Sequence, residues 1–205
     1  MDGAGKSEDV IQKILSIKEQ CICVRGNREK YIIDGMPTVV HDERVKVSKE
    51  QLDRNEWIKK HLSNTSIEFI KSLPAEKIIE IFDKKIYMAH YPMDNKMNFK
   101  KHVKVANLQD NEKMFENVEA DIYLYGHTHT EIYNKNFNKC YINPGALGCP
   151  GKTNEAPYGI LEIDRKTVTY KQLKVKYNVK KVIENINKLA FPEYKNVLKT
   201  FYGID

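Results

Sequence analysis

The chain has 205 residues and a mass of 23.9 kDa, which is enough for one domain of ordinary to large size with its own hydrophobic core. Hydrophobic residues make up 41% and charged residues 30%, with only 10 Gly and 7 Pro, which excludes a disordered or fibrous chain. No apolar run reaches the roughly 18 residues that cross a bilayer, and the first residues lack the apolar segment of a secretory signal. We therefore expect a single domain over residues 1–205, located in the cytoplasm and without a membrane partner.

The cysteines and the charge distribution indicate the redox state of the thiols and the kinds of partner to expect. None of the four cysteines lies in a CxxC pair, so we expect reduced thiols. The net charge of +6 resides in residues 164–205, which hold 10 Lys and Arg against 4 Asp and Glu. These basic residues are scattered and no arginine cluster or stacking-aromatic pattern accompanies them, so we expect a solvated surface rather than a nucleic-acid interface. An acidic partner or an anionic substrate is the alternative.

The first half of the chain predicts helices and strands in alternation. A capping residue at Ser7 and apolar residues on one helical face predict a helix over 7–20. The continuous apolar run 21–24 predicts a buried parallel strand that ends at Gly26-Asn27. A helix is expected over 48–73, with its end at Pro74, and two strands are expected over 78–82 and 86–89.

The second half continues the same pattern. A helix is predicted over 108–118, a strand over 121–125 and a loop over 126–130. The remaining predicted elements are strands 140–142, 158–163 and 168–175, a helix over about 180–189 and a short terminal helix. The last two helices form a basic segment from about residue 178 to 205. Strands early and late with helices between them predict an α/β sandwich.

Polar side chains that could bind a metal follow three of the predicted strands. Asn27 follows 21–24, His90 follows 86–89, and His127 and His129 follow 121–125. Ligands of such sheets gather outside the carboxyl ends of the strands, so we expect these residues to converge. In extended chain, His127 and His129 share a side at roughly 6.6 Å between Cα atoms, which suits one ion or two neighbouring ions. The alternative is that both are exposed turn residues.

The types of these side chains favour particular ions. Imidazole nitrogens with an amide or carboxylate oxygen suit divalent Mn, Fe, Zn, Ni or Co better than Ca, which prefers oxygen alone. Asp2 is the nearby carboxylate that could bridge two ions. The other histidines, His41, His61 and His102, have no partner at ligand spacing, and we expect them on the surface.

Four short stretches carry a resemblance to a known family. They are Gly26-Asn27-Arg28-Glu29, Ala89-His90-Tyr91-Pro92, Gly126-His127-Thr128-His129, and Asn143-Pro144-Gly145-Ala146-Leu147-Gly148-Cys149-Pro150 followed by Tyr158-Gly159-Ile160-Leu161-Glu162. In this order and spacing they resemble the GNH[D/E], single-His, GHxH and NPGSxGxPR elements of the calcineurin-like metallophosphoesterases. The resemblance is to the small bacterial and archaeal phosphodiesterase branch, and it covers residues 2 to about 175.

The resemblance implies a four-layer α/β/β/α sandwich with a dinuclear metal centre that activates a bridging water. One ion would be held by Asn27, His90 and His127 with a bridging Asp, and the other by His129, the same Asp, and an upstream Asp and His. Asp2-Gly3-Ala4-Gly5 is similar to the family's Asp-x-x-Gly element, so Asp2 is the expected bridge. Mn is the expected metal, with Fe, Zn, Ni or Co as alternatives.

Two departures from the family pattern affect these expectations. The chain contains no Asp-x-His, the family's first element, so we expect the first strand to be missing and the second metal site to be weak. A misassigned start, a truncation or a degraded gene would each explain this departure.

The second departure is Arg28, which stands where many relatives carry a histidine. Arginine cannot act as a general acid near neutral pH, but its planar fork can clamp phosphate oxygens. A solvent-facing arginine is the alternative.

These observations predict a metal-dependent hydrolase of phosphate esters, a phosphodiesterase or phosphatase, with Asn27 and Arg28 as catalytic residues. A small, nucleotide-like phosphate ester is the expected substrate, and the sequence leaves open whether the chain forms a homo-oligomer. A binding scaffold on the same fold, impaired in catalysis, is the alternative, because fold alone does not settle function.

Overall fold

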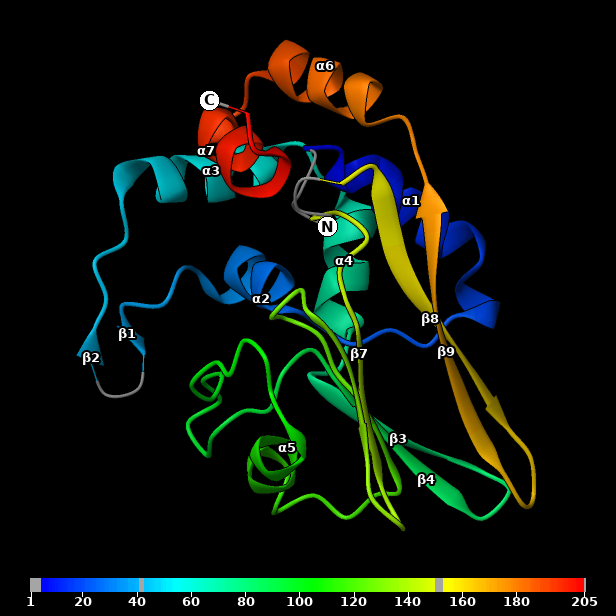
Figure 1. Cartoon of the computed structure of the whole chain (residues 1–205). Helices are drawn as coiled ribbons and strands as arrows, with labels where there is room; N and C mark the ends of the chain where they lie inside the picture. The colour runs from blue at the N-terminus through cyan, green and yellow to red at the C-terminus, as the bar shows by residue number, and fades with distance from the viewer. Residues whose placement is uncertain (1–4, 41–42, 150–152, 205) are drawn as a thin grey trace.

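Three parallel strands form the centre of the structure. In the computed structural model, which describes residues 5–40, 43–149 and 153–204, β4 (Lys84–Ala89), β5 (Ile122–Leu124) and β7 (Cys140–Pro144) are parallel neighbours. β3 (Glu76–Ile81) pairs antiparallel with β4 at one edge, and β6 (Glu131–Lys135) pairs antiparallel with β7 at the other. The sheet order is β3-β4-β5-β7-β6. This mixed sheet with flanking helices confirms the predicted α/β class (Figure 1).

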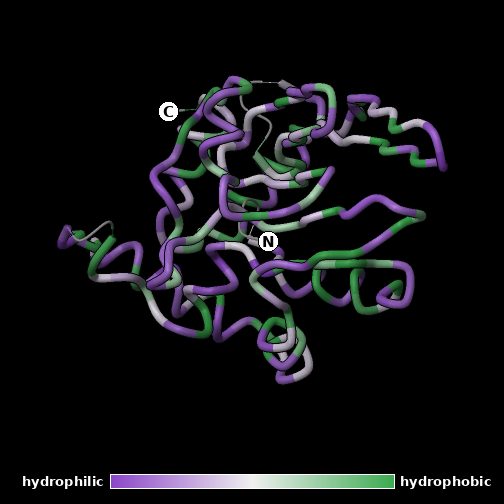
Figure 2. The backbone as a smooth tube through the Cα atoms, turned by 90° about the horizontal axis from the view of Figure 1, so that it is seen from below, coloured by the Kyte–Doolittle hydropathy of each residue, from purple (hydrophilic) through white to green (hydrophobic). Residues whose placement is uncertain are grey.

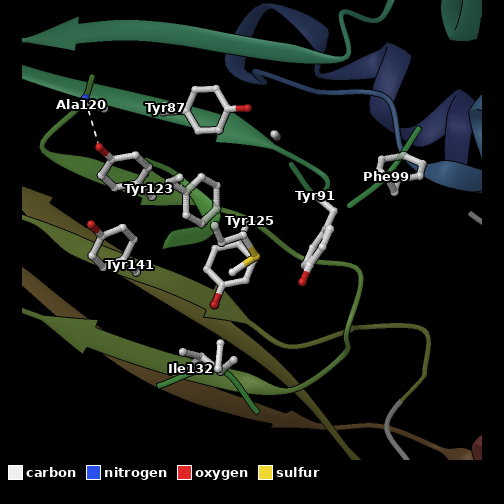
Figure 3. Close-up of a cluster of buried hydrophobic side chains, with 12 residues drawn as sticks. Tyr87, Tyr91, Phe99, Ala120, Tyr123, Tyr125, Ile132 and Tyr141 are labelled. Atoms are coloured by element: carbon white, nitrogen blue, oxygen red, sulfur yellow. Dashed lines mark hydrogen bonds between the residues drawn. The ribbon is translucent and has the colours of Figure 1, made fainter. Parts of the chain in front are cut away.

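The register of the strands gives the central sheet one aromatic face. Tyr87, Tyr123 and Tyr141 lie opposite one another on β4, β5 and β7, and all three are buried. The rings of Tyr123 and Tyr141 stack at 4.6 Å between centroids. Phe115, which directly follows α5 (Leu108–Met114), packs against all three tyrosines. The result is an aromatic core between the sheet and α5. Figure 3 shows Tyr87, Tyr123 and Tyr141 of this core.

The opposite face of the same strands is aliphatic. Ile86, Ile122, Cys140 and Ile142 are buried there, because neighbouring residues along a strand point to opposite faces. The hairpin formed by β8 (Glu155–Ile163) and β9 (Val168–Lys176) covers this face with partly buried apolar side chains. This hairpin is the second sheet of the sandwich, and it lies beside the central sheet in Figure 1.

Two groups of helices lie on one side of the central sheet (Figure 1). The first group shares a core of four isoleucines; its members are α1 (Ser7–Ser16), followed by a 3₁₀ turn (Lys18–Gln20), α2 (Asn27–Asp34), α3 (Lys49–Lys60) and α4 (Asn64–Ser72). The second group packs on Trp57 of α3; its members are α6 (Val179–Leu189), α7 (Tyr194–Val197) and a π-helical turn (Leu198–Tyr202). A small hairpin, β1 (Val39–Val40) and β2 (Glu43–Arg44), joins α2 to α3.

Hydrophobic and hydrophilic stretches alternate along the described part of the chain (Figure 2). Within the described residues, no helix combines the length and the apolar character needed to cross a membrane.

Three predicted elements differ from the structure. The strand expected over 21–24 is wrong, because the segment has no strand partner there; beside it, Arg25 N donates to Pro74 O at 2.8 Å. The helix expected over 48–73 is two helices, since Ser63 leaves the helical conformation and its hydroxyl caps α4 by accepting from Ser66 N. Gly26-Asn27, where the strand over 21–24 was expected to end, is instead the start of helix α2, which begins at Asn27.

Candidate metal centre

The carboxyl ends of the three parallel strands meet at one edge of the sheet. His90 directly follows β4, and Gly126 follows the end of β5 by two residues. Gly126 N donates to His90 O at 2.9 Å, and Tyr125 N donates to Ile142 O of β7 at the same distance. The first hydrogen bond joins the loops that carry His90 and His127, and the second joins the His127 loop to β7. The sequence predicted this edge as the position of the site.

Three histidines form a chain of contacts at this edge. His90 Nε2 lies 2.9 Å from His127 Nδ1, and His127 Nε2 lies 2.6 Å from His102 Nε2. His102 comes from the loop between β4 and α5, far from the other two in sequence. His102 is exposed as expected, and its contact with His127 is one that its spacing in the sequence does not indicate. His61 is exposed as well, and its ring stacks on Trp57, whereas His41 lies outside the described residues.

The surroundings of His90 and His127 keep both side chains uncharged at neutral pH. Burial is the main cause that lowers the pKa of His90 to about 4, and the neighbouring His129 and His102 contribute to the same shift. Burial also lowers the pKa of His127 to about 3, with additional contributions from His90 and His102. A protonated imidazole has no lone pair for a metal, whereas a neutral imidazole has one. His90 and His127 are therefore in the form that a metal ligand requires.

The contact with His102 limits the tautomers that His127 can adopt. A neutral imidazole donates from one nitrogen and accepts at the other, so two Nε2 atoms 2.6 Å apart must share one hydrogen. The hydrogen lies on either His102 Nε2 or His127 Nε2, and only a hydrogen on His127 Nε2 leaves a lone pair on neutral His127 Nδ1, beside His90. Partners of this kind orient a ligating histidine and set its tautomer.

The loop that carries His127 and His129 is held in an uncommon conformation. His127 and His129 have φ values of 70° and 59°, in the left-handed region that residues other than glycine rarely adopt. The side chain of Asn143 in β7 is fully buried and contacts this loop. Its Nδ2 donates to Gly126 O and to Thr128 Oγ1, each at 3.0 Å. Because such strain persists only where surrounding structure enforces it, Asn143 positions both histidines.

The start of α2 brings Asn27 and Arg28 to the same edge. The carboxylate of Glu29 accepts a hydrogen bond from Gly26 N at 2.8 Å, which satisfies one of the free donors at the start of the helix. A Cβ atom on Gly26 would lie 2.6 Å from Glu29 Oε2 and 3.2 Å from His90 Nδ1. A glycine is therefore needed for α2 to approach His90 this closely.

An open pocket of about 690 Å³ brings the predicted residues together. Its wall includes Asn27, Arg28, His90, His127 and His129. The segment 144–149, residues 157–159 of β8 and two residues from helical regions, Arg54 and Phe201, also line it. Buried Arg54 of α3 pairs with Glu193 at 3.5 Å, and the Phe201 ring lies 5.9 Å from that of His129.

Some of the predicted metal ligands remain untested. Asp2, the expected bridge, lies outside the described residues. Among residues 5–40, 43–149 and 153–204, no three His, Cys, Asp or Glu side chains are arranged to hold one ion. The metal roles of Asn27, His90, His127 and His129 therefore stay predictions. His102 and Asn143 belong to the site although neither was predicted there; the Asn-Pro-Gly run after a buried strand was a signal for Asn143, whereas His102 carried none.

Comparison with known proteins identifies the family. Residues 3–166 match the calcineurin-like phosphoesterase superfamily domain, so the chain belongs to this superfamily and the resemblance of its motifs is confirmed. The uncharacterized protein MJ0912 of Methanocaldococcus jannaschii is 28% identical over 160 residues, which are 67% of this chain and 60% of that protein. The chain thus spans about 60% of the length of this curated relative.

A solved structure shows the same fold. The hypothetical protein PH1004 of Pyrococcus horikoshii OT3 superposes with a TM-score of 0.78 at 15% sequence identity. The superposition covers 100% of this chain and 82% of that one. At this identity the similarity supports the metallophosphoesterase-type architecture and nothing about a substrate.

Proposed function

We propose that this chain is a metal-dependent hydrolase of phosphate esters that acts at the pocket containing His90 and His127. The observation that carries the proposal is the 2.9 Å separation of two uncharged histidine nitrogens at the wall of an open pocket in a calcineurin-like phosphoesterase. Arg28 in the same wall supplies a positive charge that suits a phosphate group.

The histidine geometry fits a shared ion. Metal–nitrogen bonds of about 2.0–2.1 Å place two ligand nitrogens roughly 2.9–3.4 Å apart when the angle at the metal is about 90–109°. His90 Nε2 and His127 Nδ1 lie within this range. Asn27 and Asp2 would complete the first site, and His129 with Asp2 would form a weaker second site. Manganese is the metal we propose, with Fe, Zn, Ni or Co as alternatives.

The residues of the chain have separate tasks in this proposal. Arg28 binds the non-bridging oxygens of the phosphate through its fork, and the N-terminus of α2 adds partial positive charge. His102 keeps His127 in the tautomer that leaves Nδ1 free. The bound ions would lower the pKa of a water molecule and neutralise charge that develops on phosphate oxygens. The proposed substrates are small phosphate esters.

Metal binding gives the first test. Calorimetric titration with Mn²⁺ should show one tight equivalent, because the chain lacks the family's Asp-x-His and the His129 site has few ligands. His127→Ala should remove the tight equivalent, whereas His61→Ala, a change at an exposed histidine that stacks on Trp57, should retain it. Two equally tight equivalents would contradict the proposed weakness of the second site.

Hydrolysis gives the second test. With added Mn²⁺ the chain should cleave bis-p-nitrophenyl phosphate, and His127→Ala should abolish cleavage while the circular dichroism spectrum stays unchanged. Arg28→Ala should slow every substrate at least tenfold, or about 1.4 kcal/mol in the barrier, whereas Arg165→Ala on the exposed surface should not. A chain that binds Mn²⁺ but cleaves no phosphate ester would favour the scaffold alternative.

A further inference from the structure

A second pocket lies directly beside the candidate metal centre. It has a volume of about 450 Å³, within the roughly 300–1,000 Å³ typical of small-molecule sites. The rings of His127 and His102 form part of its wall, and His127 also lines the first pocket. A molecule whose phosphate lies beside His127 can therefore extend another group into this second pocket.

The remaining wall is largely apolar and partly aromatic. Its apolar members are Tyr31, Pro37, Val40, Val45 and Phe99, which come from α2, the β1–β2 hairpin and the loop after β4. Two aromatic rings among aliphatic side chains suit a flat ring better than a polar sugar, because aromatic pairs gain from stacked or edge-on contact in addition to buried area.

Phe99 couples this wall to the histidines. Its side chain is buried, and its ring stacks on His127 at 5.4 Å between centroids and meets His90 edge-on at 5.8 Å. The loop that carries Phe99 is held by Asp94, whose carboxylate accepts from Lys96 N and Asn98 N, each at 2.9 Å. The aromatic wall is therefore formed before any ligand binds.

The polar groups of the pocket favour an anionic ligand with a polar ring edge. Lys30 and Lys101 line it together with Asn98, and no acidic side chain among the described residues does so. Lys30 pairs with Asp34 at 2.8 Å, which offsets part of its charge, so Lys101 supplies the larger share of the positive charge at this wall. These cations attract a phosphate-bearing molecule, and the lysine and asparagine groups can donate hydrogen bonds to ring heteroatoms.

We infer that this pocket binds the aromatic group of a phosphate ester, either an aryl group or a nucleobase. The location of the phosphate rests on the proposed function, but the preference for an aromatic group rests on the second pocket alone. Phosphonates allow the preference for an aromatic group to be measured without catalysis, because an ester hydrolase does not cleave their carbon–phosphorus bond. Phenylphosphonate and methylphosphonate carry the same charged group and differ in the ring.

The experiment is isothermal titration calorimetry of the Mn²⁺-loaded chain with both phosphonates. Phenylphosphonate should bind at least tenfold more tightly than methylphosphonate. Val45→Trp, which fills the pocket, should reduce phenylphosphonate affinity to that of methylphosphonate and leave methylphosphonate binding unchanged. Val45→Asp should also abolish the preference for the ring. Val105→Trp, at a valine with 73% of its surface exposed, is the matched control and should preserve the preference.

Two further ligands distinguish an aryl group from a nucleobase. If the ring is a nucleobase, AMP should bind more tightly than ribose 5-phosphate, and Val45→Trp should remove this difference too. Equal affinities within both ligand pairs, or preferences that Val45→Trp leaves intact, would overturn the inference. A ring preference that depends on Val45 in a chain that cleaves no ester would uphold the inference and refute the proposed hydrolase instead.

Discussion

Asn143 offers a quantitative test of how the fold positions the histidine loop. Its fully buried side chain makes three hydrogen bonds at 3.0 Å, donating to Gly126 O and Thr128 Oγ1 and accepting from Gly145 N. A buried hydrogen bond contributes about 1 kcal/mol net, and a partner left without one costs about 1–3 kcal/mol. Asn143→Ala should therefore destabilise the chain by about 3 kcal/mol or more.

The assay is unfolding in urea, followed by circular dichroism. A loss of about 3 kcal/mol corresponds to a fall in Tm of roughly 6–12 °C for a chain of this length. Asn143→Asp keeps the shape of the side chain and the acceptor for Gly145 N. Asn143→Asp replaces the donating nitrogen with an oxygen that faces Gly126 O, so it should destabilise the chain as strongly as Asn143→Ala does.

A matched control separates buried from exposed hydrogen bonds. Asn136 also makes three, accepting from Asn138 N at 2.9 Å and Lys139 N at 2.8 Å and donating to Glu112 Oε1 at 2.7 Å, but its side chain is exposed. Water can replace these partners, so Asn136→Ala should cost about 1 kcal/mol or less. If Asn143→Ala costs no more than Asn136→Ala, the positioning role of Asn143 is refuted.

Three further predictions test other parts of the structure. Tyr125→Phe removes the hydrogen bond of 2.8 Å to buried Asn111 Oδ1 and should cost about 1–3 kcal/mol in urea unfolding. Gly26→Ala would place a methyl group 2.6 Å from Glu29 Oε2 and 3.2 Å from His90 Nδ1 and should weaken Mn²⁺ binding in calorimetry. Gly35→Ala, at the other end of α2, adds a methyl group that meets nothing within 4 Å and should leave Mn²⁺ binding unchanged. Burial raises the pKa of the Cys140 thiol from 9.0 to about 11, so between these pH values the folded chain keeps a proton that the unfolded chain releases. The contribution of the protonated thiol to folding stability is therefore complete below pH 9 and lost by about pH 11. Over that interval, Cys140→Ala should lose less stability than the wild type.

The position of the site was predictable because it depends on strands that the sequence marks clearly. The runs before His90 and His127 are short and apolar, and in a parallel sheet their carboxyl ends meet at one edge. The same reasoning failed for residues 21–24. An apolar run becomes a strand only where another strand offers hydrogen bonds, and the described structure has none beside this segment.

Other features depend on packing that no local pattern reveals. His102 reaches His127 from an irregular loop whose course is set by the contacts of its neighbours. The start of helix α2, in contrast, could have been predicted from the sequence, because Glu29 lies three residues after Gly26, which is the spacing of a capping box. Sequence spacing predicts which residues leave a strand together, but not which loop residues contact them.

The pocket wall formed by Phe201 has a consequence for the order in which the site is completed. Its other members include Asn27, His90 and His127, so the wall joins residues from both ends of the chain. Contacts between residues so distant in sequence form late, because the intervening chain must first lose its conformational freedom. During synthesis, the strands that carry His90 and His127 can pair before residue 201 leaves the ribosome. The nascent chain would thus hold the paired histidines in an unfinished cleft until the helical turn that carries Phe201 has been synthesised and packs against it.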